Sequence, residues 1–378
     1  MEAALSKKDC NISCKKTSIG GQALIEGIMM RGPEYSAMAV RNPEGEIVLE
    51  KWENNKPKNP KIRKIPIIRG VLNFISSMAS GYKCLMRSAE ISGLDDLEDE
   101  MKREKEEKKA KKAAEKAAKK GAVAPESTSE ADSEADVVSE AESQTTVKKE
   151  KKESSALLNT IMVIAMVLAV VLSVGLFIML PTFIYKWLSE LLPFLKPKDP
   201  ALASLVKSVF EGVLKIAVLV GYMAAVSLMK DIKRTFQYHG AEHKTIFCYE
   251  HGKELTVENV RTERRFHPRC GTSFLILMLL VGIFVSFFID PVSILITGGA
   301  PTPLVRTLIR LLLLPIIMGL GYELIKLAGR HDNLFTRIIS APGVWLQHIT
   351  VLEPTDDMIE CAIKAFVEVI PEDESDKF

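Results

Sequence analysis

The chain has 378 residues, of which 47% are hydrophobic and 26% are charged, and its formal net charge is +2. A single soluble domain mixes these residue classes. Here they are segregated into apolar runs and charged tracts, which is typical of a multi-pass membrane protein. The Lys-rich tract at 102–120 is balanced by glutamates and no nucleic-acid motif is present, so no nucleic-acid partner is expected. Residues 1–30 contain no basic-then-apolar stretch that ends in small residues, so no cleaved signal peptide is expected.

Residues 19–94 are predicted to form a small α+β N-terminal domain that does not span the membrane. Residues 37–40 and 46–52 read as two short strands, and Asn42-Pro43-Glu44-Gly45 supplies the turn between them, so the pattern predicts a hairpin. An apolar stretch at 71–86 is short and is interrupted by Ser and Gly. It is predicted to form an amphipathic helix that lies on the bilayer surface or packs on the hairpin.

Residues 95–155 are predicted to be a disordered charged linker, because their Lys/Glu/Ala-rich and Ser/Glu/Ala-rich sequence offers almost nothing for a core. A mostly α-helical transmembrane domain is predicted to follow at 156–328. It contains four apolar runs, each long enough to cross a hydrocarbon core of about 30 Å as a helix. These runs are residues 157–184, 205–229, 273–296 and 304–327.

Lysines and arginines are distributed unevenly around the four runs. They crowd the loop at 230–272 and flank the first and last runs, whereas the connections at 185–203 and 297–303 carry few or none. This bias predicts that the loop and both termini are cytoplasmic. The C-terminal segment, residues 329–378, is predicted to contain an amphipathic helix with Thr355 as its cap.

The 230–272 loop contains the sequence His239-Gly240-Ala241-Glu242-His243. Two imidazoles four residues apart share one face of a helix and can bind one metal ion, and the carboxylate between them is a natural proton acceptor for a metal-bound water. The order H-x-x-E-H is that of the inverted zincins. The motif therefore predicts His239 and His243 as metal ligands and Glu242 as a catalytic base, on a helix that continues the second span. Zinc is the expected metal because it suits imidazole and thiolate, with iron and manganese as alternatives.

A catalytic zinc site needs a third protein ligand, and the sequence offers three candidates. Glu250 follows the motif by seven residues and shares its face if the helix continues. His267 and Cys270 form an H-x-x-C pair just before the third span, in a turn with proline and glycine. If both join the motif histidines, the site is closed and structural; if only three ligands bind, a position for water remains. In the alternative interpretation the histidines are interfacial, and the motif carboxylate pairs with a nearby lysine or arginine.

Ionisable residues also occur inside the predicted spans, where they are costly and usually face a bundle interior or a watery cavity. Glu211 and Lys215 share a face of the second span, and Arg306 and Arg310 repeat their four-residue spacing in the fourth. One interpretation is a polar pocket or ion pathway in which Glu211 pairs with Arg306 or Arg310. The other is snorkelling of the basic side chains to the outer headgroups. Glu323, near the inner end of the fourth span, is expected to approach the metal loop from the other side.

Several separate motifs follow one another along the chain: Gly20-Gly21-Gln22-Ala23, residues 26–31, residues 239–244, residues 249–250, residues 267–274, Pro342-Gly343, Leu346-Gln347 and residues 353–357. In this order they resemble the YqhQ-like family of bacterial membrane proteins. The resemblance covers most of the chain except the linker and the far ends. It implies a membrane protein of unknown function that is labelled a predicted metal-dependent enzyme. Val351 and Leu352 depart from the more polar pair expected in the tail motif, so the tail is given no catalytic role.

The leading functional hypothesis is a membrane-embedded, metal-dependent hydrolase that acts at the cytoplasmic surface on a peptide or lipid-linked substrate. Glu26 and Arg31 of the glycine-rich N-terminal segment are expected to form part of its pocket. The second hypothesis is a transporter or channel in which the outer charges line a path. The third is a scaffold whose metal is purely structural. The substrate and the oligomeric state do not follow from the sequence.

Overall fold

The structure is a computed structural model that describes residues 16–54, 62–93, 164, 167–299, 301–331, 333–373 and 375–377. The predicted linker at 95–155 lies outside these residues. The chain divides into two compact units, one made of Met1–Asp95 with Pro181–Phe378 and the other of Asp96–Leu180. In the second unit the structure describes helical residues that end in the π-helical element η2 (Gly175–Met179). The sheet and the candidate site belong to the first unit.

The first unit contains a four-stranded antiparallel sheet in which the strands are neighbours in sequence order. They are β1 (Gly20–Leu24), β2 (Gly27–Arg31), β3 (Tyr35–Arg41) and β4 (Ile47–Glu53). The hairpin of β3 and β4 confirms the predicted one. The sequence did not indicate β1 and β2, because glycine is unfavourable in strands and these two segments lack a clear alternation of apolar and polar residues.

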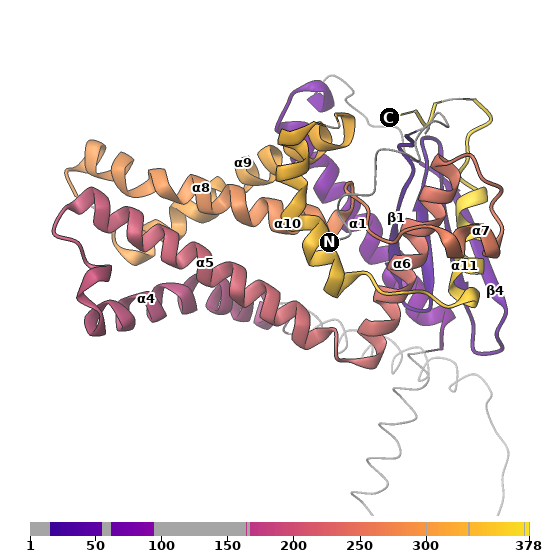
Figure 1. The fold of residues 1–378 in the computed structure, drawn as a ribbon, viewed down its shortest axis with the longest axis horizontal. Helices are drawn as coiled ribbons and strands as arrows, with labels where there is room; N and C mark the ends of the chain where they lie inside the picture. Colours follow the sequence, from indigo (N-terminus) through magenta and orange to yellow (C-terminus); the bar gives the residue numbers. More distant parts are fainter. Residues whose placement is uncertain are drawn as a thin grey trace, which may run out of the picture. The chain divides into compact units, whose positions relative to one another are not determined.

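Helices cover both faces of this sheet (Figure 1). On one face, α6 (Lys230–Glu250) and α11 (Asp356–Val367) form a core with the side chains of Ile28 and Met30. On the other face, α1 (Ile68–Ile91) brings Cys84 against Met29 and Met38. β2 is therefore enclosed from both sides, which accounts for its continuous apolar sequence. The helix predicted over 71–86 lies within α1 and packs on the sheet, which is one of its two predicted positions.

Within the described residues, four helices are long and apolar enough to cross a membrane, so the protein is a multi-pass membrane protein, as its composition predicts. The spans are Val167–Leu191, Leu202–Val226, Gly271–Thr297 and Leu304–Arg330. The boundary between the two units falls within the first of them. The corresponding α-helices are α4 (Leu180–Leu191), α5 (Pro200–Val226), α8 (Gly271–Thr297) and α9 (Pro303–Arg330). The first unit also contains η1 (Ile62–Lys64), η3 (Pro193–Leu195), α7 (Val257–Thr262) and α10 (Leu334–Thr350).

α6 is a separate helix, contrary to the prediction that it continues the second span. α5 ends at Val226, and a turn over residues 227–229 precedes the start of α6 at Lys230. The apolar sequence gives way to Lys230 and Asp231 at this point. The turn therefore lets the polar helix leave the axis of the span and pack its buried face on the sheet.

Candidate metal centre

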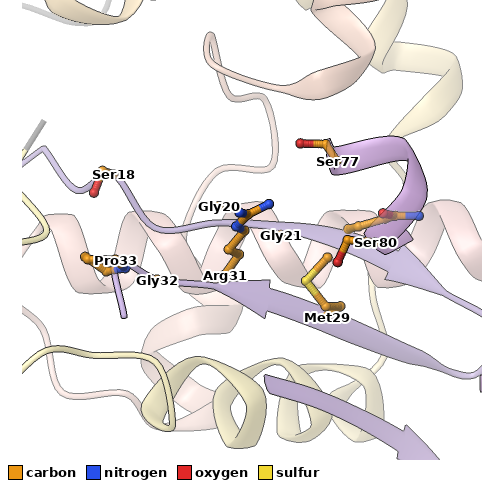
Figure 2. A pocket seen from close by; sticks show the side chains of 10 residues that line it. Ser18, Gly20, Gly21, Met29, Arg31, Gly32, Pro33, Ser77 and Ser80 are labelled. Atoms are coloured by element: carbon orange, nitrogen blue, oxygen red, sulfur yellow. The ribbon is translucent and has the colours of Figure 1, made fainter. Parts of the chain in front are cut away.

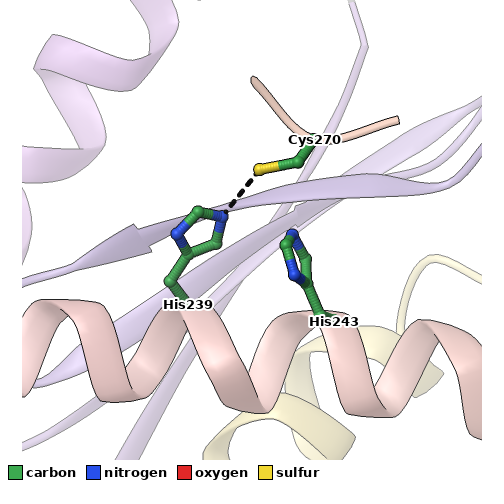
Figure 3. A group of neighbouring side chains, drawn as sticks. All are labelled: His239, His243 and Cys270. Carbon is green, nitrogen blue, oxygen red and sulfur yellow. Dashed lines mark hydrogen bonds between the residues drawn. The ribbon is translucent and has the colours of Figure 1, made fainter. Parts of the chain in front are cut away.

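The two motif histidines lie one turn apart on α6, and Figure 3 shows both rings on the same side of the helix. Gly240 between them does not interrupt the helix. A Cβ atom at Gly240 would lie 1.9 Å from the carbonyl oxygen of Leu352, so the close approach of the chain after α10 requires glycine here. The amide of Leu352 donates a hydrogen bond of 2.9 Å to the carbonyl of Phe236, which ties the same chain segment to α6.

Cys270 reaches the histidines from the N-terminal end of α8. Its side chain occupies the N-cap position, where the sulfur accepts a hydrogen bond from the amide of Thr272. Gln347 of α10 holds the preceding loop: its side chain accepts from the amide of His267 at 2.8 Å and donates to the carbonyl of His267 at 2.7 Å. The loop is therefore fixed on both sides of the cysteine, once by α8 and once by α10.

His239, His243 and Cys270 form a cluster in which one ligand atom from each residue lies within 4.8 Å of the others. Nε2 of His239 and Sγ of Cys270 are 3.1 Å apart (Figure 3). His243 and Cys270 are only 1% and 5% exposed. Two imidazoles and a thiolate at this separation are a donor set suited to zinc, and a small movement would bring all three to bonding distance.

Backbone carbonyls fix both imidazoles through the nitrogen that points away from the cluster. Nδ1 of His239 lies 3.0 Å from the carbonyl oxygen of Thr350, and Nδ1 of His243 contacts that of Arg265. A carbonyl can only accept, so both Nδ1 atoms carry hydrogen. Nε2 of His243 is buried and has no hydrogen-bond partner among the described residues. Hydrogen bonds from the second ring nitrogen to a carbonyl orient metal-binding histidines in proteins.

The charges within the cluster favour the metal-binding form of the cysteine. Burial by itself raises the pKa of the Cys270 thiol, but His239 and His243 outweigh it and hold that pKa well below its usual value. Burial lowers the pKa of His239, but Cys270 counteracts it and the pKa is raised to about 9. The lowered pKa favours the thiolate, which is the form of cysteine that binds metals.

Glu242 lies beside this cluster on the wall of a cavity of about 140 Å³. His243 and Cys270 line the same cavity, and the start of β1 covers it at Gly20 and Gly21. The carboxylate accepts a hydrogen bond of 3.0 Å from the amide of Gly21. Burial raises the pKa of Glu242, although both motif histidines oppose this. The carboxylate is thus held in place next to a space that admits small molecules.

The family described as "Protein of unknown function (DUF1385)" matches residues 65–372 of the chain. The chain is also 31% identical to "Uncharacterized protein YqhQ" of Bacillus subtilis (strain 168) over 356 residues, which cover 93% of this chain and 92% of that protein. The chain belongs to the DUF1385 family. No solved structure matches it. Since neither description states an activity, the function of this DUF1385 protein has to be inferred from its site.

Glu250 and His267, the other proposed ligands, lie next to the cluster but make different contacts. The amide of Arg269 donates to Nδ1 of His267 at 3.2 Å, and Nε2 of His267 lies 3.9 Å from a Glu250 oxygen. Glu250 also accepts from the guanidinium of Arg269 and from the amide of Thr17. Burial lowers the pKa of His267 to about 4. Both nitrogens of His267 are therefore engaged outside the metal cluster.

Glu26, Arg31 and Glu323 lie away from the metal cavity. Glu26 pairs with Arg234 on α6. Arg31 lines a different pocket of about 330 Å³, in which Gly20 and Gly21 also take part (Figure 2). Glu323 pairs with Arg69 at the start of α1 instead of approaching the metal loop. The glycine pair of β1 thus lines both this pocket and the metal cavity.

The ionisable residues of the spans form two buried pairs between helices. Arg310 of α9 lies 3.0 Å from Glu211 of α5, which is one of the two predicted pairings. Arg306 forms a bidentate pair with Asp290 of α8, with contacts of 2.6 and 2.9 Å. Lys215 of α5 is buried as well, with 9% of its surface exposed. The arginines are therefore paired within the bundle instead of reaching the outer headgroups.

Two residues that hold the site were not found by sequence reasoning. Gly21 was assigned to a glycine-rich segment, but nothing in the sequence indicates that its amide contacts Glu242. Gln347 occupies a fully buried position in α10. A buried glutamine has no local sequence signal, because its partners lie some 80 residues away.

Proposed function

We propose that this protein is a membrane-anchored, metal-dependent hydrolase. In this proposal His239, His243 and Cys270 hold a divalent cation, with zinc favoured by the soft donor set. One observation carries it: both imidazoles are locked by carbonyls at Nδ1, and the buried Nε2 of His243 has no other described partner. An orphaned buried nitrogen is costly, and a cation removes this cost.

Three protein ligands support a catalytic site over a structural one. Structural zinc sites have four protein ligands, whereas catalytic sites keep a fourth position for water or substrate. Nδ1 of His267, a neighbouring imidazole, accepts from the amide of Arg269, so its Nε2 carries the hydrogen and faces Glu250 at 3.9 Å. The cavity of about 140 Å³ adjoins the cluster, which leaves space on the side that no ligand occupies. When bound, the cation would acidify water and polarise a carbonyl or phosphoryl oxygen.

Glu242 is proposed as the general base. As the oxygen of water bonds to the electrophilic centre, the carboxylate accepts one proton and returns it to the leaving group when the scissile bond breaks. One water is consumed for each bond cleaved. The bond from the Gly21 amide fixes one carboxylate oxygen. The raised pKa of Glu242 matches a group that must take up and release a proton.

The location supports chemistry at the membrane surface. Three residues separate the end of the second span from the start of α6, and Cys270 directly precedes the first residue of the third span. The cluster therefore lies at one end of both spans. The excess of lysine and arginine in this loop supports the cytoplasmic side.

Elemental analysis of the purified full-length protein tests the metal site. We expect stoichiometric metal in the wild type and in His348→Ala, which removes an exposed histidine elsewhere, and little metal in His243→Ala. Glu242→Gln should keep the metal and lose hydrolysis, because the amide cannot accept a proton. Equal, near-zero metal in the wild type and His243→Ala would overturn the proposal.

Transport is the second candidate, and the buried charges of the spans favour it. Glu211 is 1% exposed, and one of its oxygens has no hydrogen-bond partner among the described residues. Such groups mark ion or proton pathways in membrane proteins. If the protein is a transporter, proton flux into proteoliposomes should depend on Glu211, and Glu211→Gln should abolish it. Flux that is equal in both proteins and in empty vesicles removes this candidate.

A further inference from the structure

A second, larger pocket lies beside the metal cavity. Its volume is about 520 Å³, and His267 and Arg269 line both spaces. Its other walls are the end of α9 at Ala328 and Gly329 and one side of α10. This volume is in the range of pockets that bind small molecules, which is roughly 300–1,000 Å³. A molecule in this pocket would therefore be separated from the metal cluster only by the loop that carries Cys270.

The pocket is strongly basic. Lys16, Arg264, Arg269 and Arg337 line it together with a single described carboxylate, Glu250. Arg269 already pairs with Glu250. Among the described residues, no carboxylate lies within ion-pair distance of Lys16 or Arg264. Arg264 instead lies over the ring of Phe247, with 5.6 Å between its guanidinium carbon and the ring centroid. The uncompensated charge favours an anionic ligand, and guanidinium groups suit phosphate in particular.

α10 places this pocket at the level of the lipid headgroups. Leu334, Phe335, Ile338 and Trp345 are 57–76% exposed. At about 100° per residue they fall within a sector of about 100° on the helix. The residues of α10 that line the pocket fall mainly on the opposite side; they are Thr336, Arg337, Ser340, Ala341 and Val344. An exposed apolar stripe with tryptophan is typical of a helix in the membrane interface. Its other face then lies where lipid phosphates are.

A peptide ligand fits this arrangement less well. Extended peptides are commonly bound by pairing with an exposed sheet edge, and β1 is the edge strand next to the metal cluster. The amide of Gly21, which points away from β2, already donates to Glu242. The backbone group closest to the cluster is therefore not available for pairing.

We propose that the basic pocket binds the phosphate group of an amphiphilic, lipid-type substrate. The assignment of this ligand as a substrate rests on the proposed hydrolase function, whereas its binding does not. Lys16, which donates to the carbonyl of Gly329 at 3.2 Å, and Arg264 supply positive charges that no described carboxylate neutralises. The α10 interface admits the acyl chains from the bilayer. The shared wall at His267 and Arg269 directs the headgroup toward the metal cavity.

Three probes that share parts of one structure test this proposal on the full-length protein in neutral detergent. Dioctanoyl phosphatidic acid carries phosphate and acyl chains, dioctanoylglycerol lacks the phosphate, and glycerol 3-phosphate lacks the chains. Binding is measured by isothermal titration calorimetry. We expect phosphatidic acid to bind roughly tenfold or more tightly than dioctanoylglycerol, and Lys16→Gln/Arg264→Gln to remove this difference. The matched control, Lys83→Gln/Lys233→Gln, removes two exposed lysines elsewhere and should bind like the wild type.

The outcomes distinguish a lipid from a soluble phosphate ester as the ligand, and they test the phosphate pocket separately from the metal site. Weak binding of glycerol 3-phosphate identifies a lipid as the ligand, and binding as tight as that of phosphatidic acid identifies a soluble phosphate ester. Equal binding of phosphatidic acid and dioctanoylglycerol, or equal affinities in the pocket and control variants, overturns the pocket. His243→Ala should lose metal but still bind phosphatidic acid, so failure of the metal site leaves a distinct signature.

Discussion

Gly20 and Gly21 offer a paired test of how β1 covers the candidate site. Replacing each by alanine adds the same methyl group to neighbouring positions of one strand. A Cβ atom at Gly20 meets nothing within 4 Å. A Cβ atom at Gly21 would lie 2.8 Å from the carbonyl oxygen of Met29 and 3.0 Å from the carboxylate carbon of Glu242. Only the second substitution therefore forces the strand and the carboxylate apart.

The expected cost at Gly21 has two parts. Loss of the amide hydrogen bond to a charged acceptor costs about 1.5–3 kcal/mol. Overpacking against a backbone atom that cannot move aside costs about 1–3 kcal/mol. For a folded part of this size, the sum lowers the melting temperature by roughly 10 °C. Gly20→Ala should be neutral or stabilising by up to about 1 kcal/mol, because alanine restricts the unfolded chain.

Thermal unfolding of the purified protein in detergent, followed by tryptophan fluorescence, measures this difference. Metal content serves as the second readout and should be the same in both variants, because no ligand comes from β1. If hydrolysis is measured, Gly21→Ala should be slowed roughly 100-fold by displacement of the base. Melting temperatures that agree for the two variants would refute the contact between β1 and Glu242.

Three further outcomes are expected from other parts of the molecule. Gln347→Leu leaves the amide and carbonyl of His267 buried without their partner and should lower the free energy of unfolding by about 2–6 kcal/mol. An unchanged melting temperature would contradict the two hydrogen bonds between Gln347 and His267. Burial lowers the pKa of His267 to about 4, below its value near 6.5 in the unfolded chain. The neutral imidazole therefore makes its full contribution to the free energy of unfolding above pH 6.5, and this contribution falls by about 3 kcal/mol as the pH is lowered to 4. His267→Gln should reduce the dependence of the free energy of unfolding on pH between pH 4 and 6.5. An equal dependence in the wild type and the variant would contradict a buried neutral imidazole. Asp290→Asn should destabilise by about 3–5 kcal/mol because it leaves Arg306 buried without its carboxylate, and adding Arg306→Met should restore much of the loss. If Asp290→Asn/Arg306→Met melts no higher than Asp290→Asn, the pair of Arg306 and Asp290 is not buried as the structure shows.

The parts of the fold that were predictable are those with a local pattern. The four spans follow from apolar runs, and the β3–β4 hairpin follows from strand residues around the Asn42–Gly45 turn. The break between α5 and α6 was missed, because a change from apolar to polar residues is also compatible with a continuous helix that leaves the bilayer. β1 and β2 were missed because their pairing and their burial are set by helices from the other end of the chain.

The candidate site likewise has one part with a local sequence pattern and one part that depends on contacts between distant residues. The four-residue spacing places His239 and His243 on one helical face whatever the fold, so this part is local. The choice among Glu250, His267 and Cys270 depends on a contact over 31 residues, and the sequence left it open. The structure brings Cys270 to the histidines. Glu250 and His267 instead contact Arg269, a residue that the spacing of the motifs did not indicate.

The spans themselves set the geometry of the candidate metal centre. Cys270 caps α8 at the membrane boundary, and the carbonyl that orients His239 comes from Thr350 at the end of α10. α10 in turn packs closely on α8, since a Cβ atom at Gly343 would lie 2.5 Å from Ser273. A shift of α8 relative to α10 therefore changes the separation of thiolate and imidazole directly. Bilayer thickness and bound lipid act on these same helices. If the proposed cation and the proposed lipid both bind, any change that one makes in the affinity for the other must be reciprocal.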